Sequence, residues 1–91
     1  MAAKLGSIQE LNAFKIESIR ANLETAIGFA KLALQSEDER EILRHRQKAC
    51  EAYEEALHSL QTTTLTHIEY EAIRTKLAHL ESILMELGQT F

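Results

Sequence analysis

The sequence predicts an all-α protein: an antiparallel up-down-up three-helix bundle with long helices, forming a single domain over residues 1–91. Three observations support this prediction. Apolar residues recur every three to four positions, which is typical of amphipathic helices. Pro is absent, Gly occurs three times, and strong helix formers dominate. Two short polar stretches interrupt the periodicity, and short connections make consecutive helices antiparallel neighbours.

The first helix is predicted over about residues 7–35. Ser7 and Glu10 match the S-x-x-E capping box, in which each side chain bonds the backbone of the other residue, so residues 1–6 are expected to fray. The main apolar face consists of Ile8, Ile16, Ile19, Leu23, Ala26, Ile27, Ala30 and Leu34. Asn12 interrupts this face. At roughly 42 Å, against roughly 35 Å for the other helices, this helix should extend beyond them by a turn or two.

The second helix is predicted over about residues 37–61. Ser36 and Glu39 form another S-x-x-E pattern, and the acidic residues between them suit the N-terminal end of a helix. A break near Gln35 is therefore predicted, although no Gly or Pro marks it and one continuous helix is the alternative. The apolar side consists of Ile42, Ala49, Cys50, Tyr53, Ala56, Leu57 and Leu60. Tyr53 is the single aromatic residue of this side, so it is expected where the three helices cross.

The third helix is predicted over about residues 66–87. The three threonines at 62–64 are β-branched and predict a loop, and the last of them is an alternative cap. Thr66 and Glu69 form a third capping box, and Gly88 lies where a C-terminal glycine is typical. The apolar side consists of Leu65, Ile73, Leu77, Leu80, Ile83, Leu84 and Leu87.

Composition narrows the classes of function and compartment. The formal net charge is −4 and the pI is about 5.5, which disfavours nucleic acid and anionic membranes as partners. The single cysteine, Cys50, has no internal disulfide partner, which favours a reducing compartment. No apolar run approaches the ~20 residues of a membrane span, and the first residues lack the apolar core of a secretory signal. We therefore expect a cytoplasmic protein.

One short motif resembles a known repeat family. The segment Ala49-x-x-x-Tyr53-x-x-Ala56-Leu57 resembles the second helix of a tetratricopeptide repeat, which favours small, aromatic and small residues at this spacing. The first-helix pattern and the closing Pro of that family are missing, and the helices are longer. Because such repeats bind helices or extended peptides, the resemblance implies a binding role.

Two further resemblances concern the whole chain. The microtubule-interacting-and-trafficking domain is similar in size, in its three helices and in the same helix motif, and residues 73–76 look like part of its third helix. Small uncharacterised bacterial three-helix proteins are more similar. They carry an apolar-Phe-Ala segment, here residues 28–30, an acidic turn, and a helix with Ala and Tyr, here residues 49–53. This likeness implies a bacterial cytoplasmic protein and transfers no catalytic residue.

Histidines and glutamates raise the possibility of a metal site. The four histidines are His45, His58, His67 and His79. Glu55 and His58 match the E-x-x-H half-motif of carboxylate-bridged metal bundles, which needs a second copy and two more inward-facing glutamates. The chain has one copy, and both residues lie opposite Tyr53, towards solvent. The sequence therefore predicts surface residues here, with no metal and no cofactor.

Two other reactive or charged features have ordinary structural interpretations. Cys50 lies on the apolar side of its helix without a neighbouring base, so it is expected to pack as a small hydrophobe. Arg40, Arg44 and Lys48 form a basic row, but glutamates flank them and no aromatic residue is interleaved for base stacking. A solvated face with local ion pairs is the favoured interpretation, with nucleic-acid binding as a lesser hypothesis. We predict that the protein is not an enzyme.

Arg46 is unusual because it lies within the apolar side of the second helix. Its stem could pack on the core while its head reaches water. Alternatively, it could form a structural ion pair with Glu24 of the first helix or Glu81 of the third, which lie at about the right height in an antiparallel bundle. The sequence leaves these two interpretations equally open.

The first helix also has an apolar stripe on its back, opposite the predicted core. The stripe and its edges consist of Phe14, Ala21, Thr25, Gly28, Leu32, Phe29 and Leu11. One interpretation is that this helix is central, with the other two helices wrapping both sides. The favoured interpretation is an exposed surface for a partner, since the small residues Ala21 and Gly28 would let another helix approach closely.

These observations predict a non-enzymatic helical protein–protein interaction module that self-associates through the back of its first helix as a homodimer or binds another helical protein. The expected contact residues are Phe14, Ala21, Thr25, Gly28, Phe29 and Leu32. The alternative is a small metal- or ligand-binding helical bundle.

Overall fold

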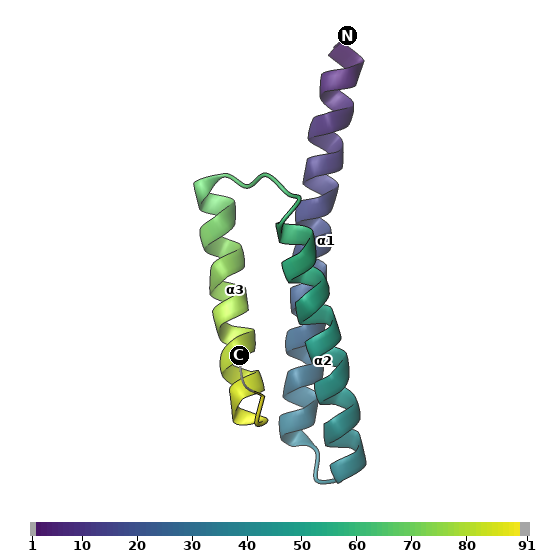
Figure 1. Ribbon diagram of the computed structural model, residues 1–91, viewed down its shortest axis with the longest axis vertical. Coiled ribbons are helices and arrows are strands. Elements are labelled where there is room, and N and C mark those ends of the chain that lie inside the picture. Colours follow the sequence, from purple (N-terminus) through teal and green to yellow (C-terminus); the bar gives the residue numbers. More distant parts are fainter. Residues whose placement is uncertain (1, 90–91) are drawn as a thin grey trace.

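The computed structural model describes residues 2–89 and consists there of three helices joined by short loops. They are α1 (Ala2–Gln35), α2 (Glu39–Leu60) and α3 (His67–Glu86). Successive helices run in opposite directions, and α1 extends well past the others at its N-terminal end (Figure 1). The predicted all-α three-helix bundle is confirmed. The predicted break between the first two helices is also confirmed, at residues 36–38.

The core lies on one broad side of α1, against which both other helices pack. The fully buried residues of α1 include Ile19, Leu23, Ala26 and Ala30, and Ala33 rather than Leu34 enters the core at its end. From the other helices the core receives Ala49, Tyr53, Ala56, Ile73, Leu80, Ile83 and Leu84. The buried alanines of α1 and α2 let these two helices lie closest together, whereas α3 contacts α1 more than it contacts α2.

The helix starts follow local hydrogen bonding, with two differences from prediction. α1 begins at Ala2, so Ser7 is inside the helix and is not its cap. The residues before it are mostly good helix formers and continue the helix. α2 is capped by Asp38, whose carboxylate accepts the Arg40 backbone N–H at 2.9 Å. The Ser36 hydroxyl instead accepts the Asp38 N–H at 3.3 Å and holds the turn.

Both ends of α3 agree with the sequence. Thr66 caps the helix, and both bonds of the Thr66–Glu69 capping box form, at 2.9 and 3.2 Å. At the other end Gly88 has φ +92°, the left-handed conformation that glycine adopts without strain. Gly88 N–H donates to the Met85 carbonyl at 3.0 Å and Gln89 N–H to the Leu84 carbonyl at 2.9 Å, which is the Schellman arrangement.

Asn12 marks the position along α1 at which the loop between α2 and α3 is attached. Its side-chain amide donates to the Thr64 carbonyl at 2.9 Å, and its side-chain oxygen accepts the Thr64 N–H at 3.3 Å. The loop between α2 and α3 is therefore tied to α1 at this position. The part of α1 before Asn12 projects about 15 Å beyond the bundle, which is longer than the predicted turn or two (Figure 1).

Candidate functional site

The back of α1 is exposed along most of its length. We call the residues Phe14, Ser18, Ala21, Thr25, Gly28 and Leu32 the seam. All six are exposed: Phe14 retains 71% of its accessible surface and Leu32 retains 47%. Because α2 and α3 both pack on the opposite side, the hypothesis that they wrap both sides of α1 is wrong. The predicted stripe therefore faces away from the core.

A shallow apolar groove lies at the C-terminal half of the seam. It has a volume of about 390 Å³ and is lined by Thr25, Gly28, Phe29 and Leu32. Gly28 forms an open floor, since a Cβ built there would meet no atom within 4 Å. All four lining residues were predicted as partner-contacting residues from the sequence. The structure brings them together into one concave surface.

Phe29 forms a fixed edge of the groove because α2 holds its ring. The ring stacks on His45, with centroids 5.9 Å apart and an interplanar angle of 22°. The Lys48 ammonium lies 5.3 Å from the ring centroid, which is a cation–π distance. His45 Nε2 in turn lies 3.3 Å from a Glu41 carboxylate oxygen. Phe29 is thus half-buried. His45 and Lys48 of α2 contact its ring, and Glu41 of α2 contacts His45.

Arg46 does not form an ion pair with Glu24 or Glu81, which was one of the two interpretations that the sequence left open. Its guanidinium donates instead to the Leu87 carbonyl at 3.1 Å, at the C-terminal end of α3. The last carbonyls of a helix are unpaired and carry partial negative charge, so a cation there satisfies an acceptor and the helix dipole together. Arg46 therefore caps α3 from α2 with a half-buried side chain.

The two acids proposed for that pair have other partners. Glu24 bonds Lys76 of α3, and the hydrogen bond and charge of Lys76 hold the pKa of Glu24 below its usual value. Glu81 accepts a hydrogen bond from the Tyr53 hydroxyl. Burial, followed by this bond to Glu81, raises the pKa of Tyr53 above its usual value. These contacts attach α3 to the other two helices.

The remaining charged candidates are exposed or paired on their own helix, and the reactive thiol is half-buried. Glu55 and His58 are both exposed on α2, and the described residues contain no cluster of three metal-ligating side chains. Cys50 is half-buried, its thiol lies 3.5 Å from the Gln89 side-chain oxygen, and burial raises its pKa. Arg44 pairs with Glu41 at 2.6 Å, so the basic row is partly neutralised.

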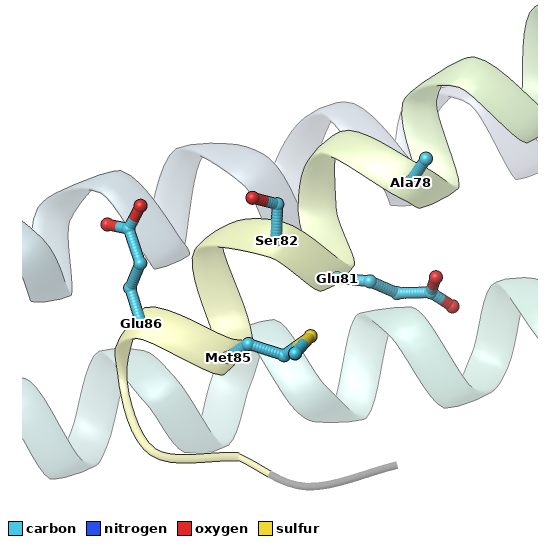
Figure 2. Close-up of a pocket in the computed structure, with 5 residues that line it drawn as sticks. All are labelled: Ala78, Glu81, Ser82, Met85 and Glu86. Atoms are coloured by element: carbon cyan, nitrogen blue, oxygen red, sulfur yellow. The ribbon is translucent and has the colours of Figure 1, made fainter.

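A second hollow lies on α3 and was not predicted. It has a volume of about 480 Å³ and is lined by Ala78, Glu81, Ser82, Met85 and Glu86, which project from one side of the helix (Figure 2). All its lining residues belong to a single helix. Its Glu81 carboxylate is already bonded to Tyr53. This hollow is therefore the outer surface of α3 rather than a cleft between elements.

The structural residues that sequence reasoning missed are the polar attachments of α3. Asn12, Lys76 and the carbonyl of Leu87 each form a contact between residues at least 41 positions apart in the chain. A signal existed for Asn12 alone, because a polar residue stands there in an apolar face. Lys76 gave no such signal, since an exposed lysine is ordinary on a helix surface.

Comparisons with known proteins identify no family for this chain. The chain matches no protein-family model, and neither the curated proteins nor the solved structures contain a significantly similar chain. None of the helices in the described part of the chain combines the length and apolar character needed to cross a membrane.

Proposed function

We propose that this chain is a non-enzymatic helical interaction module whose binding surface is the seam on α1. The observation that supports this function is the continuous exposed stripe from Phe14 to Leu32, with an apolar groove at one end. It spans about 27 Å of helix. Apolar stripes of this kind, bordered by charged residues, are typical of surfaces that bind another protein.

The composition of the seam suits a helix better than a loop or a small molecule. Its middle consists of Ser18, Ala21, Thr25 and Gly28, whose short side chains allow a second helix axis to approach to about 8 Å. The larger Phe14 and Leu32 at the two ends supply most of the apolar contact. A docked helix would thus bury the large residues while its backbone lies over the small ones.

Other exposed apolar residues do not form a comparable surface. Leu43 on α2, and Ile68 and Tyr70 on α3, are exposed but line neither hollow, and the exposed Met85 lines the hollow on α3 together with two glutamates. Single exposed apolar residues are ordinary on soluble proteins. The buried Ala49 and Tyr53, which carry the tetratricopeptide resemblance, are used in the core. The residues that carry that resemblance therefore pack α2 against the core, and the proposed binding surface is the seam.

We further propose that the module self-associates and acts in the cytoplasm, where the free thiol of Cys50 stays reduced. Sedimentation of the wild type and of Gly28→Leu tests the seam. We expect a wild-type dimer and a monomeric variant of unchanged helical content, because a Cβ at this exposed position meets no atom of its own chain within 4 Å, whereas the leucine side chain obstructs a docked helix.

The matched control is Ala78→Leu, which introduces the same leucine side chain at an exposed helical position away from the seam. This variant should sediment as the wild type does. A wild type that is monomeric at high micromolar concentration would contradict self-association. Dissociation by Ala78→Leu but not by Gly28→Leu would place the interface on α3 instead.

The alternative of a metal-binding bundle has a separate test. Its ligands would have to include Glu55 and His58, which are exposed one turn apart on α2. Elemental analysis of the purified protein after dialysis against a chelator measures any bound metal. We expect no stoichiometric zinc or iron, and retention of either would favour the alternative.

A further inference from the structure

The seam is symmetric in the size of its side chains. In chain order it consists of a large residue, four small ones and another large one, separated by four, three, four, three and four positions. Phe14 and Leu32 lie equally far from position 23, as do Ser18 and Gly28, and Ala21 and Thr25. The stripe therefore has the same pattern when it is followed in either direction along α1.

This symmetry matters for the orientation of a docked helix. Alternating steps of three and four are the spacing of a coiled-coil contact face. In an antiparallel pair of identical helices, each residue meets the one equally far from the midpoint, so a size pattern that is symmetric about the midpoint sets large side chains against large ones and small against small. In a parallel pair each residue meets its own copy, and no symmetry is needed. The observed symmetry therefore lets an antiparallel pair keep one helix separation along the whole seam, whereas a parallel pair keeps it with any sequence.

We infer that the occupant of the seam is α1 of a second copy of this chain, running antiparallel with a two-fold axis at position 23. This inference rests on the proposed function and adds the orientation and register of the two copies. Phe14 then meets Leu32 of the second copy, Ser18 meets Gly28, and Ala21 meets Thr25. Two-fold pairing makes the same contacts twice, which is the usual symmetry of homodimers.

The groove fits this register. Phe14 is the most exposed aromatic side chain of the described residues. Opposite it, the register places Leu32 of the second copy, which is one wall of the apolar groove and lies one turn from Gly28 at the floor of the groove. Each copy thus offers one projecting ring and one hollow. The α2 contacts that hold Phe29 keep the hollow open before the partner arrives.

The charges beside the seam also agree with it. One flank carries Glu17, Glu24 and Lys31 at seven-residue spacing. The antiparallel register places Glu17 near Lys31 of the second copy, twice. Within its own chain Glu17 contacts Arg20 at 3.5 Å, whereas Lys31 has no carboxylate at ion-pair distance among the described residues. Glu24 lies next to the axis, where its bond to Lys76 offsets repulsion between the two copies.

The other flank carries Lys15, Asn22 and Phe29, again at seven-residue spacing. In the same register Asn22 lies at the axis beside its copy, where two side-chain amides can exchange hydrogen bonds. Lys15 lies beside Phe29 of the second copy. Apart from Glu24 at the axis, the residues of both flanks are thus complementary to those of the second copy in the antiparallel orientation.

Disulfide cross-linking tests the register directly. Ser18→Cys and Gly28→Cys are each made in a Cys50→Ser background, which removes the natural thiol. We expect a mixture of the two variants to form a disulfide-linked heterodimer on mild oxidation, identified by intact mass. Each variant alone should not cross-link, because its two copies would be offset by about 15 Å along the axis, while a disulfide needs Cα atoms within about 7 Å.

A charge exchange provides the second measurement. Glu17→Lys should weaken the dimer roughly fivefold in Kd, and so should Lys31→Glu, because each places like charges together at two symmetric sites. The double variant should restore most of the wild-type affinity. Circular dichroism on every variant verifies the fold.

The outcomes separate this inference from the proposed function. A wild type that dimerises but whose variants each cross-link to themselves would show a parallel pair and overturn the inference. A dimer with neither cross-linking pattern would overturn it as well, and in both cases the seam function would stand if Gly28→Leu still dissociates the protein. A monomeric wild type would overturn the self-association together with its register.

Discussion

The two faces of α1 differ in the kind of apolar residue they carry. The core face has fully buried Ile19 and Leu23 with closely packed alanines, whereas the seam has small residues between an exposed Phe14 and an exposed Leu32. Both faces carry apolar residues, but the seam also includes the hydroxyl side chains of Ser18 and Thr25. The core face fills the space between three helices with branched side chains. The seam instead leaves room for a helix backbone, with bulk only at its ends.

This comparison separates folding from association. A change on the core face should reduce the stability of one chain, because a cavity is left among fixed neighbours. A change on the seam should leave the chain folded and alter only what binds to it. Substitutions on the two faces should therefore have separate effects, on the stability of the chain and on its association.

Truncation of one leucine on each face compares them directly. Leu23→Ala should lower the free energy of unfolding by about 3–4 kcal/mol, since Leu23 is fully buried in the core. Leu32→Ala, nearly half exposed on the same helix, should cost less than about 1 kcal/mol in the monomer. Urea denaturation at low protein concentration measures both. Equal losses for the two variants would remove the distinction between the faces.

Tyr53→Ala should cost about 3 kcal/mol, because the ring is buried where α2 meets the rest of the core. Tyr53→Phe keeps the ring and removes the hydrogen bond to Glu81, so about 1 kcal/mol should be lost. A loss well below 1 kcal/mol for the alanine variant would show that Tyr53 is not central to the core.

The same tyrosine predicts an alkaline loss of stability. The pKa of Tyr53 is raised in the folded state, by burial first and by Glu81 second. The folded chain therefore keeps the phenol protonated where the unfolded chain loses the proton. The resulting stability is complete below pH ~10 and declines as the pH rises above that value. Tyr53→Phe should show a smaller decline in denaturation experiments between neutral and alkaline pH.

Arg46→Met should cost about 1 kcal/mol, because the Leu87 carbonyl at the end of α3 loses its cationic donor while most of the apolar stem is replaced. The measurement is a set of double-mutant cycles in chemical denaturation. Cycles between Arg46 and either Glu24 or Glu81 should give no coupling, as neither acid contacts the guanidinium. Clear coupling with either acid would restore the ion pair.

Gly28→Ala has the smallest expected effect. The site is exposed and helical with open space around it, so the variant should stabilise the single chain by about 0.5–1 kcal/mol. At the same time it should not tighten the dimer, since the methyl group occupies the floor of the groove. Thermal unfolding at low concentration and sedimentation separate these two effects. A tighter dimer would show that the close approach at Gly28 is not used.

Several features of this protein follow from sequence alone because they depend on residues close together in the chain. The Thr66–Glu69 box and the Gly88 terminator need only neighbouring backbone groups, and their predictions are confirmed. The opposition between the core face and the seam follows from the helical period, which places Leu23 and Gly28 on different sides. The N-cap of α2 does not follow from sequence alone, since Ser36 and Asp38 both have suitable side chains. In the structure Asp38 is the N-cap.

Other features were decided only by the tertiary structure. Arg46 has several rotatable bonds and could reach acids or carbonyls on two helices, so its partner depends on the relative heights and crossing of α2 and α3. The projection of α1 depends on where Asn12 meets the loop at Thr64. The groove at Gly28 exists because α2 holds Phe29 at one side of it, and α2 is placed there by core packing between helices rather than by any local signal.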